Sequence, residues 1–342
     1  MKTPYFACGL LISCMLSVGC SPDIGYTAVE DLVFEDAAFK ACVISEAREN
    51  GWVNAGQVIK LHCVNPTGQK IASITGIENL HNVRELDLAH NAIADLAPLV
   101  ALKKLDRLNF DDNRIRQLPD GISHFSVTHL SLVRNMIRDI SVINVFQRLE
   151  VLNLASNRVN DISALQQNRA LQVLNLNQNQ VADISPLGSL MKLRELDLGN
   201  NRISDLAALE SLQQLEHLYL GNNHVSDLSP LAGLSELREI DLANNQVTSI
   251  QPLVDLENIW RLSLDHNPIE SIEPLLEYSE LESISLRGVG NLSCETVRTV
   301  LPEVAVGAWI GVDGCPSSDP LGGAGRRLMW PAGVGLWWCL RG

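Results

Sequence analysis

A histidine and a tyrosine near the middle of the chain stand in line with carboxylates at a constant spacing of 22 residues. Two such series, offset by two positions, consist of Glu195, His217, Glu239 and Arg261, and of Asp197, Tyr219 and Asp241. A histidine between carboxylates has the groups for acid–base catalysis or for metal binding. An aromatic residue beside charged groups also suits a protein-binding hot spot. The choice depends on the elements that hold these residues.

The spacing of 22 is a repeat that extends along most of the chain. Asparagine recurs without insertion at Asn91, Asn113, Asn135, Asn157, Asn179, Asn201, Asn223, Asn245 and Asn267. An L-x-L triplet precedes most of these positions, as in Leu152-Asn153-Leu154, and the full frame reads L-x-x-L-x-L-x-x-N-x-I-x-D-I-x-P-L-x-x-L. A fixed period of this length indicates a stacked repeat architecture.

This frame resembles the leucine-rich repeat, and segments such as "DISPL" and "DLSPL" are similar to the 22-residue class of bacterial internalins and of a eukaryotic phosphatase regulator. The resemblance covers about residues 71–290. It implies an α/β fold: a curved solenoid with a parallel sheet on the concave side, turns or short 3₁₀ segments on the convex side, and a cap at each end.

Strand geometry and stacking predict the same arrangement. Side chains alternate between faces of a strand, so L-x-L sends two leucines inward and one residue outward. Stacked repeats share one core, and about ten strands would form a concave face of roughly 48 Å. The recurring asparagine is predicted to satisfy backbone groups where the chain turns. The aspartates that follow it, such as Asp227, are predicted to cap turns.

The outward positions should form two columns on the concave face, which places His217 and Tyr219 between two pairs of carboxylates. An open sheet excludes no water, which argues against catalysis, and carboxylates two strands apart lie roughly 10 Å from each other, too far to converge on one ion. We therefore expect no catalytic residue, no metal and no cofactor. The predicted partner-binding residues are Glu195, Asp197, His217, Tyr219, Glu239, Asp241 and Arg261. The alternative is a solvated face without a dedicated partner.

The charge of the chain argues against a nucleic-acid partner. The 342 residues contain 26 Lys and Arg against 40 Asp and Glu, a net charge of -14, whereas nucleic-acid binding depends on cationic contacts. Acidity of this kind favours solubility, and a basic partner or a cation as ligand is the alternative. We expect a monomer that binds a protein partner.

The first residues have the pattern of a secretory signal: Lys2, an apolar run from Phe6 to Val18, and then small residues. "LSVGC" resembles the lipobox of bacterial lipoproteins, which implies that Cys20 becomes the lipid-bearing N-terminus, with Cys14 as the alternative. Ser21 implies sorting to a Gram-negative outer membrane, with the protein exported and held at the cell envelope by its lipid. Secretion without lipid is the other alternative.

Cysteines mark both predicted caps. Because the caps lie at opposite ends of a solenoid, and a disulfide requires close approach, we expect Cys42 to pair with Cys63, and Cys294 with Cys315; reduced thiols are the alternative. Phe39, Cys42, Gly51, Trp52 and Cys63 also resemble the cap of leucine-rich-repeat lipoproteins of gamma-proteobacteria.

The predicted domains follow from these patterns. They are a lipoprotein signal peptide at 1–19, a linker at 20–33, an N-terminal cap at 34–70, repeats at 71–290, a C-terminal cap at 291–316 and a disordered Gly/Arg/Trp-rich tail at 317–342. "QLPDGISHF", after Asn113, departs from the frame, so a local change is expected on the convex side. The repeat after Asn135 lacks its proline and should differ as well.

The resemblance and the absence of catalytic motifs together favour a non-enzymatic scaffold that recognises a macromolecule on its concave face, in adhesion or envelope interaction. The alternatives are a structural or regulatory envelope component and a phosphatase-regulator-like binding protein.

Overall fold

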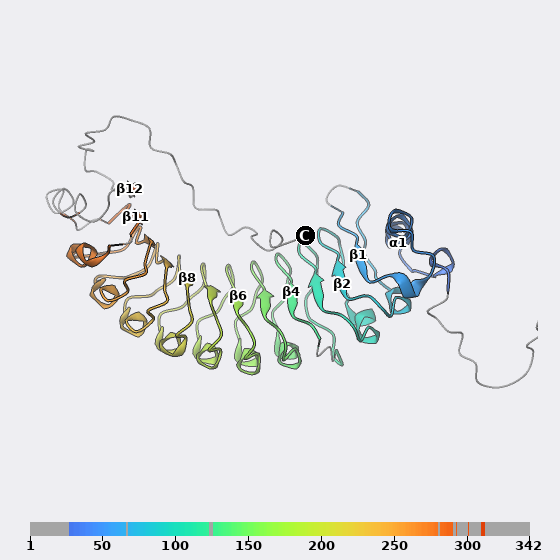
Figure 1. The fold of residues 1–342 in the computed structure, drawn as a ribbon, viewed down its shortest axis with the longest axis horizontal. Helices are drawn as coiled ribbons and strands as arrows, with labels where there is room; N and C mark the ends of the chain where they lie inside the picture. The colour runs from blue at the N-terminus through green and yellow to red at the C-terminus, as the bar shows by residue number, and fades with distance from the viewer. Residues whose placement is uncertain are drawn as a thin grey trace, which may run out of the picture.

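A computed structural model describes residues 27–65, 68–122, 126–279, 281–289, 292, 300 and 309–311. These residues form a curved stack, with the strands of one parallel sheet along the concave side and 3₁₀ turns along the convex side (Figure 1). The leucine-rich-repeat solenoid predicted from the sequence is therefore confirmed. The predicted signal peptide, the pair Cys294–Cys315 and the tail lie outside the described residues.

The sheet contains twelve three-residue strands within the described part of the chain, arranged in sequence order and all parallel. They are β1 (Lys60–His62), β2 (Glu85–Asp87), β3 (Arg107–Asn109), β4 (His129–Ser131), β5 (Val151–Asn153), β6 (Val173–Asn175), β7 (Glu195–Asp197), β8 (His217–Tyr219), β9 (Glu239–Asp241), β10 (Arg261–Ser263), β11 (Ser283–Ser285) and β12 (Trp309–Gly311). β12 was not predicted, because its residues fall outside the repeat frame.

Short 3₁₀ helices occur in the N-terminal cap (the first two below) and form the opposite wall of most repeats. They are η2 (Val29–Asp31), η3 (Ala55–Gln57), η4 (Ile77–Asn79), η5 (Ala97–Ala101), η6 (Ser141–Val145), η7 (Ser163–Gln167), η8 (Ser185–Ser189), η9 (Ala207–Ser211), η10 (Ser229–Leu231), η11 (Gln251–Leu253) and η12 (Glu273–Glu277). Aspartates at one frame position, Asp227 among them, accept a hydrogen bond from the backbone N–H two residues later. Ser249 and Ser271 replace them with a hydroxyl acceptor. The predicted capping role is confirmed.

The leucine positions of the frame fill the core between the two walls. In one repeat, Leu218 and Leu220 from the strand meet Val225, Leu228, Leu231 and Leu234 from the turns, and each of these residues is at most 1% exposed. Burial of one such side chain stabilises the fold by about 1.5–3 kcal/mol. Because most repeats contribute the same set, one hydrophobic core extends along the stack.

The recurring asparagine links two consecutive turns. Asn223 donates from Nδ2 to Leu198 O of the preceding repeat at 2.9 Å and to Leu220 O at 3.0 Å, while its Oδ1 accepts from Ile203 N at 2.9 Å. Its equivalents from Asn91 to Asn267 repeat this pattern. These bonds satisfy backbone groups that would otherwise be buried without a partner, and the predicted structural role is confirmed.

The residue before each of these asparagines adopts the left-handed conformation. Among the described residues, the non-glycine positions with positive φ are His90, Asp112, Arg134, Ser156, Gln178, Asn200, Asn222, Asn244 and His266, all with φ between 51° and 60°. We call these nine residues the rim column. Gly288, at φ 63°, continues the same spacing. Asparagine, aspartate and histidine, which include Asn222, tolerate this conformation better than most side chains.

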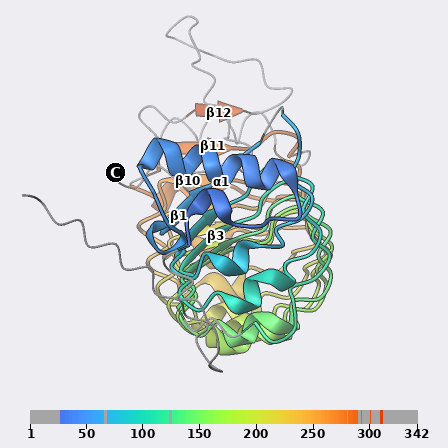
Figure 2. The same cartoon turned by 90° about the vertical axis from the view of Figure 1, so that its right-hand side faces the viewer.

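Helix α1 (Ala37–Asn50) covers the N-terminal end of the stack and lies across it (Figure 2). Asp36 begins the helix by accepting hydrogen bonds from Ala38 N and Phe39 N, and Gly51, at φ 70°, ends it. Phe39, Val43 and Ala47 are buried at helical spacing. The second carboxylate oxygen of Asp36 accepts from Ala72 N at 2.8 Å, so one side chain both caps α1 and ties it to the first repeat.

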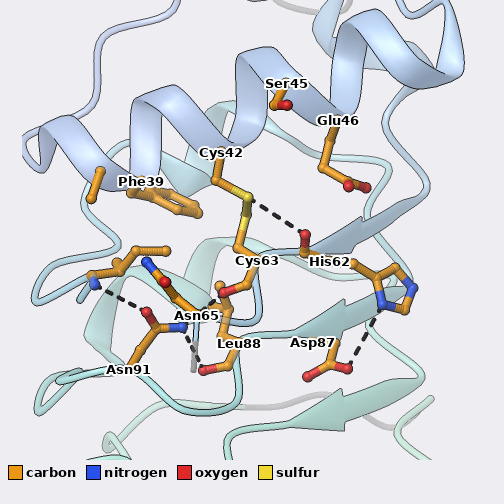
Figure 3. The surroundings of a disulfide bond; sticks show 12 residues. Phe39, Cys42, Ser45, Glu46, His62, Cys63, Asn65, Asp87, Leu88 and Asn91 are labelled. Carbon is orange, nitrogen blue, oxygen red and sulfur yellow. Dashed lines mark hydrogen bonds and ion pairs between the residues drawn. A yellow bond between two sulfur atoms is a disulfide. The ribbon is translucent and has the colours of Figure 1, made fainter. Parts of the chain in front are cut away.

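A disulfide joins Cys42 of α1 to Cys63, just after β1, with a Cα–Cα distance of 5.8 Å (Figure 3). This is the pairing expected for the N-terminal cap. Cys63 is 2% exposed, and its carbonyl accepts a hydrogen bond from Asn91 Nδ2 at 2.8 Å. The covalent link is therefore connected to the first asparagine of the repeat series.

Two details differ from the sequence prediction. The predicted linker reaches residue 33, but Val29 and Leu32 are 1% and 4% exposed, and Val29 N donates to Val53 O, so the cap includes these residues. On the convex side, the described residues between β3 and β4 contain no 3₁₀ helix; Gln117 instead forms an isolated parallel bridge with Asp139. The change expected after Asn113 is present, whereas η6 forms without the proline.

Candidate functional site on the concave face

The register of the sheet brings the two predicted series together. Glu195, His217, Glu239 and Arg261 are successive cross-strand partners on β7 to β10, and Asp197, Tyr219 and Asp241 are partners two positions along the same strands. All seven predicted residues therefore occupy neighbouring positions of one sheet face. Glu239 and those residues that contact it directly, namely His217, Tyr219 and Arg261, are called the Glu239 cluster below.

Glu239 is the centre of this cluster. Its Oε2 accepts a hydrogen bond from Tyr219 Oη at 3.0 Å, and its Oε1 lies 3.1 Å from Arg261 Nη1. His217 Nδ1 lies 3.5 Å from Oε2, at ion-pair distance but without hydrogen-bond geometry. Glu239 is 7% exposed. The cluster therefore surrounds a buried carboxylate with three donors, which is the condition under which such a charge is tolerated.

The pKa shifts are consistent with this arrangement. Burial alone would raise the pKa of Glu239, but interactions with His217, Tyr219 and Arg261 outweigh it and lower that pKa. The interaction with Glu239 raises the pKa of His217 above its ordinary value of 6.5, against the effect of burial. Burial and the nearby charge of Glu239 raise the pKa of Tyr219, which stays a hydroxyl donor. Glu239 is thus held ionised, and His217 is biased toward the cation.

Asp197 and Asp241 serve the backbone rather than a solvated surface. Asp197 is 8% exposed, and its Oδ1 accepts from Gly199 N and from Asn177 Nδ2, each at 3.0 Å. Asp241 Oδ1 accepts from Ala243 N at 2.9 Å. Burial raises the pKa of both carboxyls, opposed by these hydrogen bonds. The polar column expected to be solvent-exposed is largely folded back onto the turns, because a short acceptor at a strand end reaches the N–H two residues later.

Gly199 leaves room for this packing. A Cβ at Gly199 would lie 2.5 Å from the Asn177 amide that crosses to Asp197, and the backbone carbonyl of Gly221 lies 3.4 Å from the same point. No side chain fits there without breaking the Asn177–Asp197 bond. Tyr219, the cross-strand partner of Asp197, is partly exposed.

Two repeats on the N-terminal side of the cluster have an uncharged concave face. Val151 and Val173 are cross-strand partners, and Asn153 and Asn175 follow them. Both valines are partly exposed. Beyond them, nearer the N-terminus, His90 and Arg134 both contact Asp112. The Glu239 cluster and these rim-column residues are therefore two charged regions separated by an uncharged stretch.

Two features were searched for in the described residues: a metal site and a membrane-spanning helix. There, no group of three or more His, Cys, Asp or Glu side chains could hold a metal ion. Within the same part of the chain, no helix has the length and hydropathy needed to span a bilayer.

The importance of Glu239 was not evident from its spacing alone. Its position in the column predicted a neighbour for His217, but the convergence of Tyr219 and Arg261 on one carboxylate depends on side-chain length. The sequence did contain a usable signal, because a histidine and an arginine lie one repeat before and after Glu239 in its own column, and a tyrosine lies in the adjacent column.

The fold and site together define a solenoid repeat protein with an open, curved sheet surface. The family described as leucine-rich repeats in two copies matches residues 69–124, 169–211 and 213–256. An internalin C2 from Listeria monocytogenes is 31% identical over 69% of this chain and 96% of its own, with a TM-score of 0.53. This chain belongs to the leucine-rich-repeat family.

Other solved structures extend the likeness. An internalin (InlF) from Listeria monocytogenes is 26% identical, covers 86% of this chain and 95% of its own, and has a TM-score of 0.69. The functional domain of InlJ from the same organism, described as including a cysteine ladder, has a TM-score of 0.66 over 84% of this chain and 62% of its own at 22% identity, which shows the fold alone. No curated protein matches the chain.

Proposed function

We propose that this protein is an exported, non-enzymatic scaffold of the bacterial cell envelope that binds a protein partner on its concave face. The observation that carries this proposal is the Glu239 cluster: a partly exposed tyrosine whose hydroxyl is already fixed by a buried carboxylate. A side chain held in place before binding loses little conformational entropy on association. Tyrosine and arginine, both present here, are enriched among binding hot spots.

We divide the seven predicted partner-binding residues by role. Tyr219, His217 and Glu195 remain as contacts, since each is partly exposed. Glu239 and Asp197 are buried and hold other groups in place, whereas Asp241 and Arg261 are partly exposed but are also engaged within the chain. The similarity to internalins supports envelope interaction as the setting. The Cys20 lipid anchor belongs to this proposal and rests on the lipobox resemblance.

Site-specific photocrosslinking in intact cells tests the surface. A photoreactive side chain at Asn222, an exposed member of the rim column next to Tyr219, should capture the partner. The column already accommodates Arg134, Gln178 and His266 in the same backbone conformation, so the change should be tolerated. The matched control is Glu210, which is exposed on η9 of the convex side.

The double substitution of His217→Ala with Tyr219→Ala should then reduce the crosslink from Asn222 at least tenfold, as expected for loss of a hot spot. His129→Ala, in the His217 column four strands away, is the control and should leave the crosslink unchanged. Equal capture from Asn222 and Glu210, or equal capture by the double variant and the parent, would contradict a partner site at Tyr219.

A further inference from the structure

Two side chains, Tyr219 and His217, face one oxygen of Glu239. Oε2 of Glu239 accepts from Tyr219 Oη at 3.0 Å, and His217 Nδ1 faces the same atom from 3.5 Å. The other oxygen, Oε1, is engaged by Arg261 at 3.1 Å. In the structure Tyr219 has the hydrogen bond, and Nδ1 is buried without one.

Protonation of His217 changes the balance between these donors. A charge-assisted bond from an imidazolium to a carboxylate is roughly twice as strong as one from a neutral donor. The charged groups that face His217 are Glu195 of β7, Glu239 of β9 and Glu216 on its own segment, all acidic. Glu216 is already bound to Arg194 at 2.6 Å. Glu239 is therefore the acceptor toward which Nδ1 is aimed.

We propose that Glu239 is the positioning residue of Tyr219, and that protonation of His217 transfers Glu239 Oε2 from the tyrosine hydroxyl to the imidazolium. With neutral His217, the hydroxyl is fixed and the ring is held. With cationic His217, the hydroxyl is released to solvent. The effect of this exchange on partner binding rests on the proposed function, whereas the exchange of donors within the chain does not.

The exchange falls in an accessible pH range. The interaction with Glu239 raises the pKa of His217 from 6.5, and the acidic neighbours Glu195 and Glu216 act in the same direction. The cation is therefore present below that raised pKa and is lost as the pH increases through it. Tyr219 remains protonated throughout this range, since its own pKa is raised.

Nuclear magnetic resonance of the full chain tests the exchange directly. With ¹⁵N-labelled histidine and ¹³Cζ-labelled tyrosine, the Tyr219 signal should move between pH 5 and 9 with the same midpoint as His217. In His217→Gln it should stay constant. Tyr219→Phe removes the competing donor, so the His217 midpoint should rise measurably, whereas Glu239→Gln should lower it by about one pH unit.

Tyr278→Phe is the matched control, because the Tyr278 hydroxyl donates to Leu253 O, away from the cluster; the His217 midpoint should not move. A Tyr219 signal that does not follow His217 overturns the proposal, and so does a His217 midpoint that Tyr219→Phe leaves unchanged. These signals need no partner. A failed crosslinking experiment at Asn222 would thus count against the proposed function and leave the exchange of donors intact.

Discussion

Asn168 is a polar residue in a core column that is otherwise apolar, and its replacement by leucine should stabilise the protein. It is fully buried, whereas the equivalent positions one repeat away on either side are Phe146 and Leu190, also fully buried. Nδ2 donates to Ile143 O at 3.1 Å and to Phe146 O at 2.9 Å, but Oδ1 has no hydrogen-bond partner.

The size of this stabilisation follows from the interactions that the substitution removes and adds. Asn168→Leu removes two hydrogen bonds worth about 0.5–1.5 kcal/mol each. Both acceptor carbonyls keep a backbone donor, Phe146 N and Leu149 N, each at 3.0 Å, so no new unpaired group is created. The change also removes the unpaired Oδ1, a cost of about 1–3 kcal/mol, and buries a leucine worth about 1.5–3 kcal/mol. The net expectation is about 2 kcal/mol of stabilisation.

The matched control is the same substitution at Asn157, in the same repeat. Asn157 Oδ1 accepts from Ile137 N at 3.0 Å, and its Nδ2 donates to Leu132 O and Leu154 O. Leucine would leave Ile137 N–H unpaired and break these bonds, so the protein should lose about 3 kcal/mol. Urea unfolding followed by circular dichroism should move the midpoint up for Asn168→Leu and down for Asn157→Leu. A midpoint that falls for both would refute the assignment of Asn168 as an unsatisfied residue.

Three further outcomes are expected. Asp36→Asn should cost about 1–2 kcal/mol at pH 7, because the amide keeps one acceptor oxygen for the α1 cap but places a donor, Nδ2, where the second carboxylate oxygen accepts from Ala72 N. Burial opposes the hydrogen bonds that lower the pKa of Asp36 below 3.8, so this stabilisation is complete above that pH and disappears below it, where parent and variant should converge in thermal melts. Replacing Cys42 and Cys63 by serine opens a link across 21 residues and should cost about 3 kcal/mol; hydrogen exchange should accelerate in α1, and equal protection of α1 would contradict a structural role. Cys20→Ala should release the protein from membranes, and palmitate labelling that persists in this variant would exclude Cys20 as the lipidated residue.

The period of 22 was sufficient to predict the sheet register, because repeats of equal length place the same frame position of neighbouring strands side by side. It also predicted the asparagine and aspartate turn contacts, since both side chains are short and the repeat places the same backbone groups beside each of them. It could not predict which outward side chains are buried: Asp197 folds onto Gly199 N, and Glu239 is enclosed by longer neighbours. Asn168 differs visibly from its column, but its unpaired oxygen depends on atomic positions. β12 lies beyond the last frame and left no periodic signal.

The rim column separates backbone shape from side-chain chemistry. Its nine members share one backbone conformation, yet they include acidic, basic, amide, hydroxyl and imidazole side chains. The fold therefore accepts different side chains at these positions, provided that the residue adopts a positive φ. A combinatorial library confined to this edge would vary the chemistry of a continuous line along the solenoid without altering its curvature, which makes the protein a scaffold for selecting new binders.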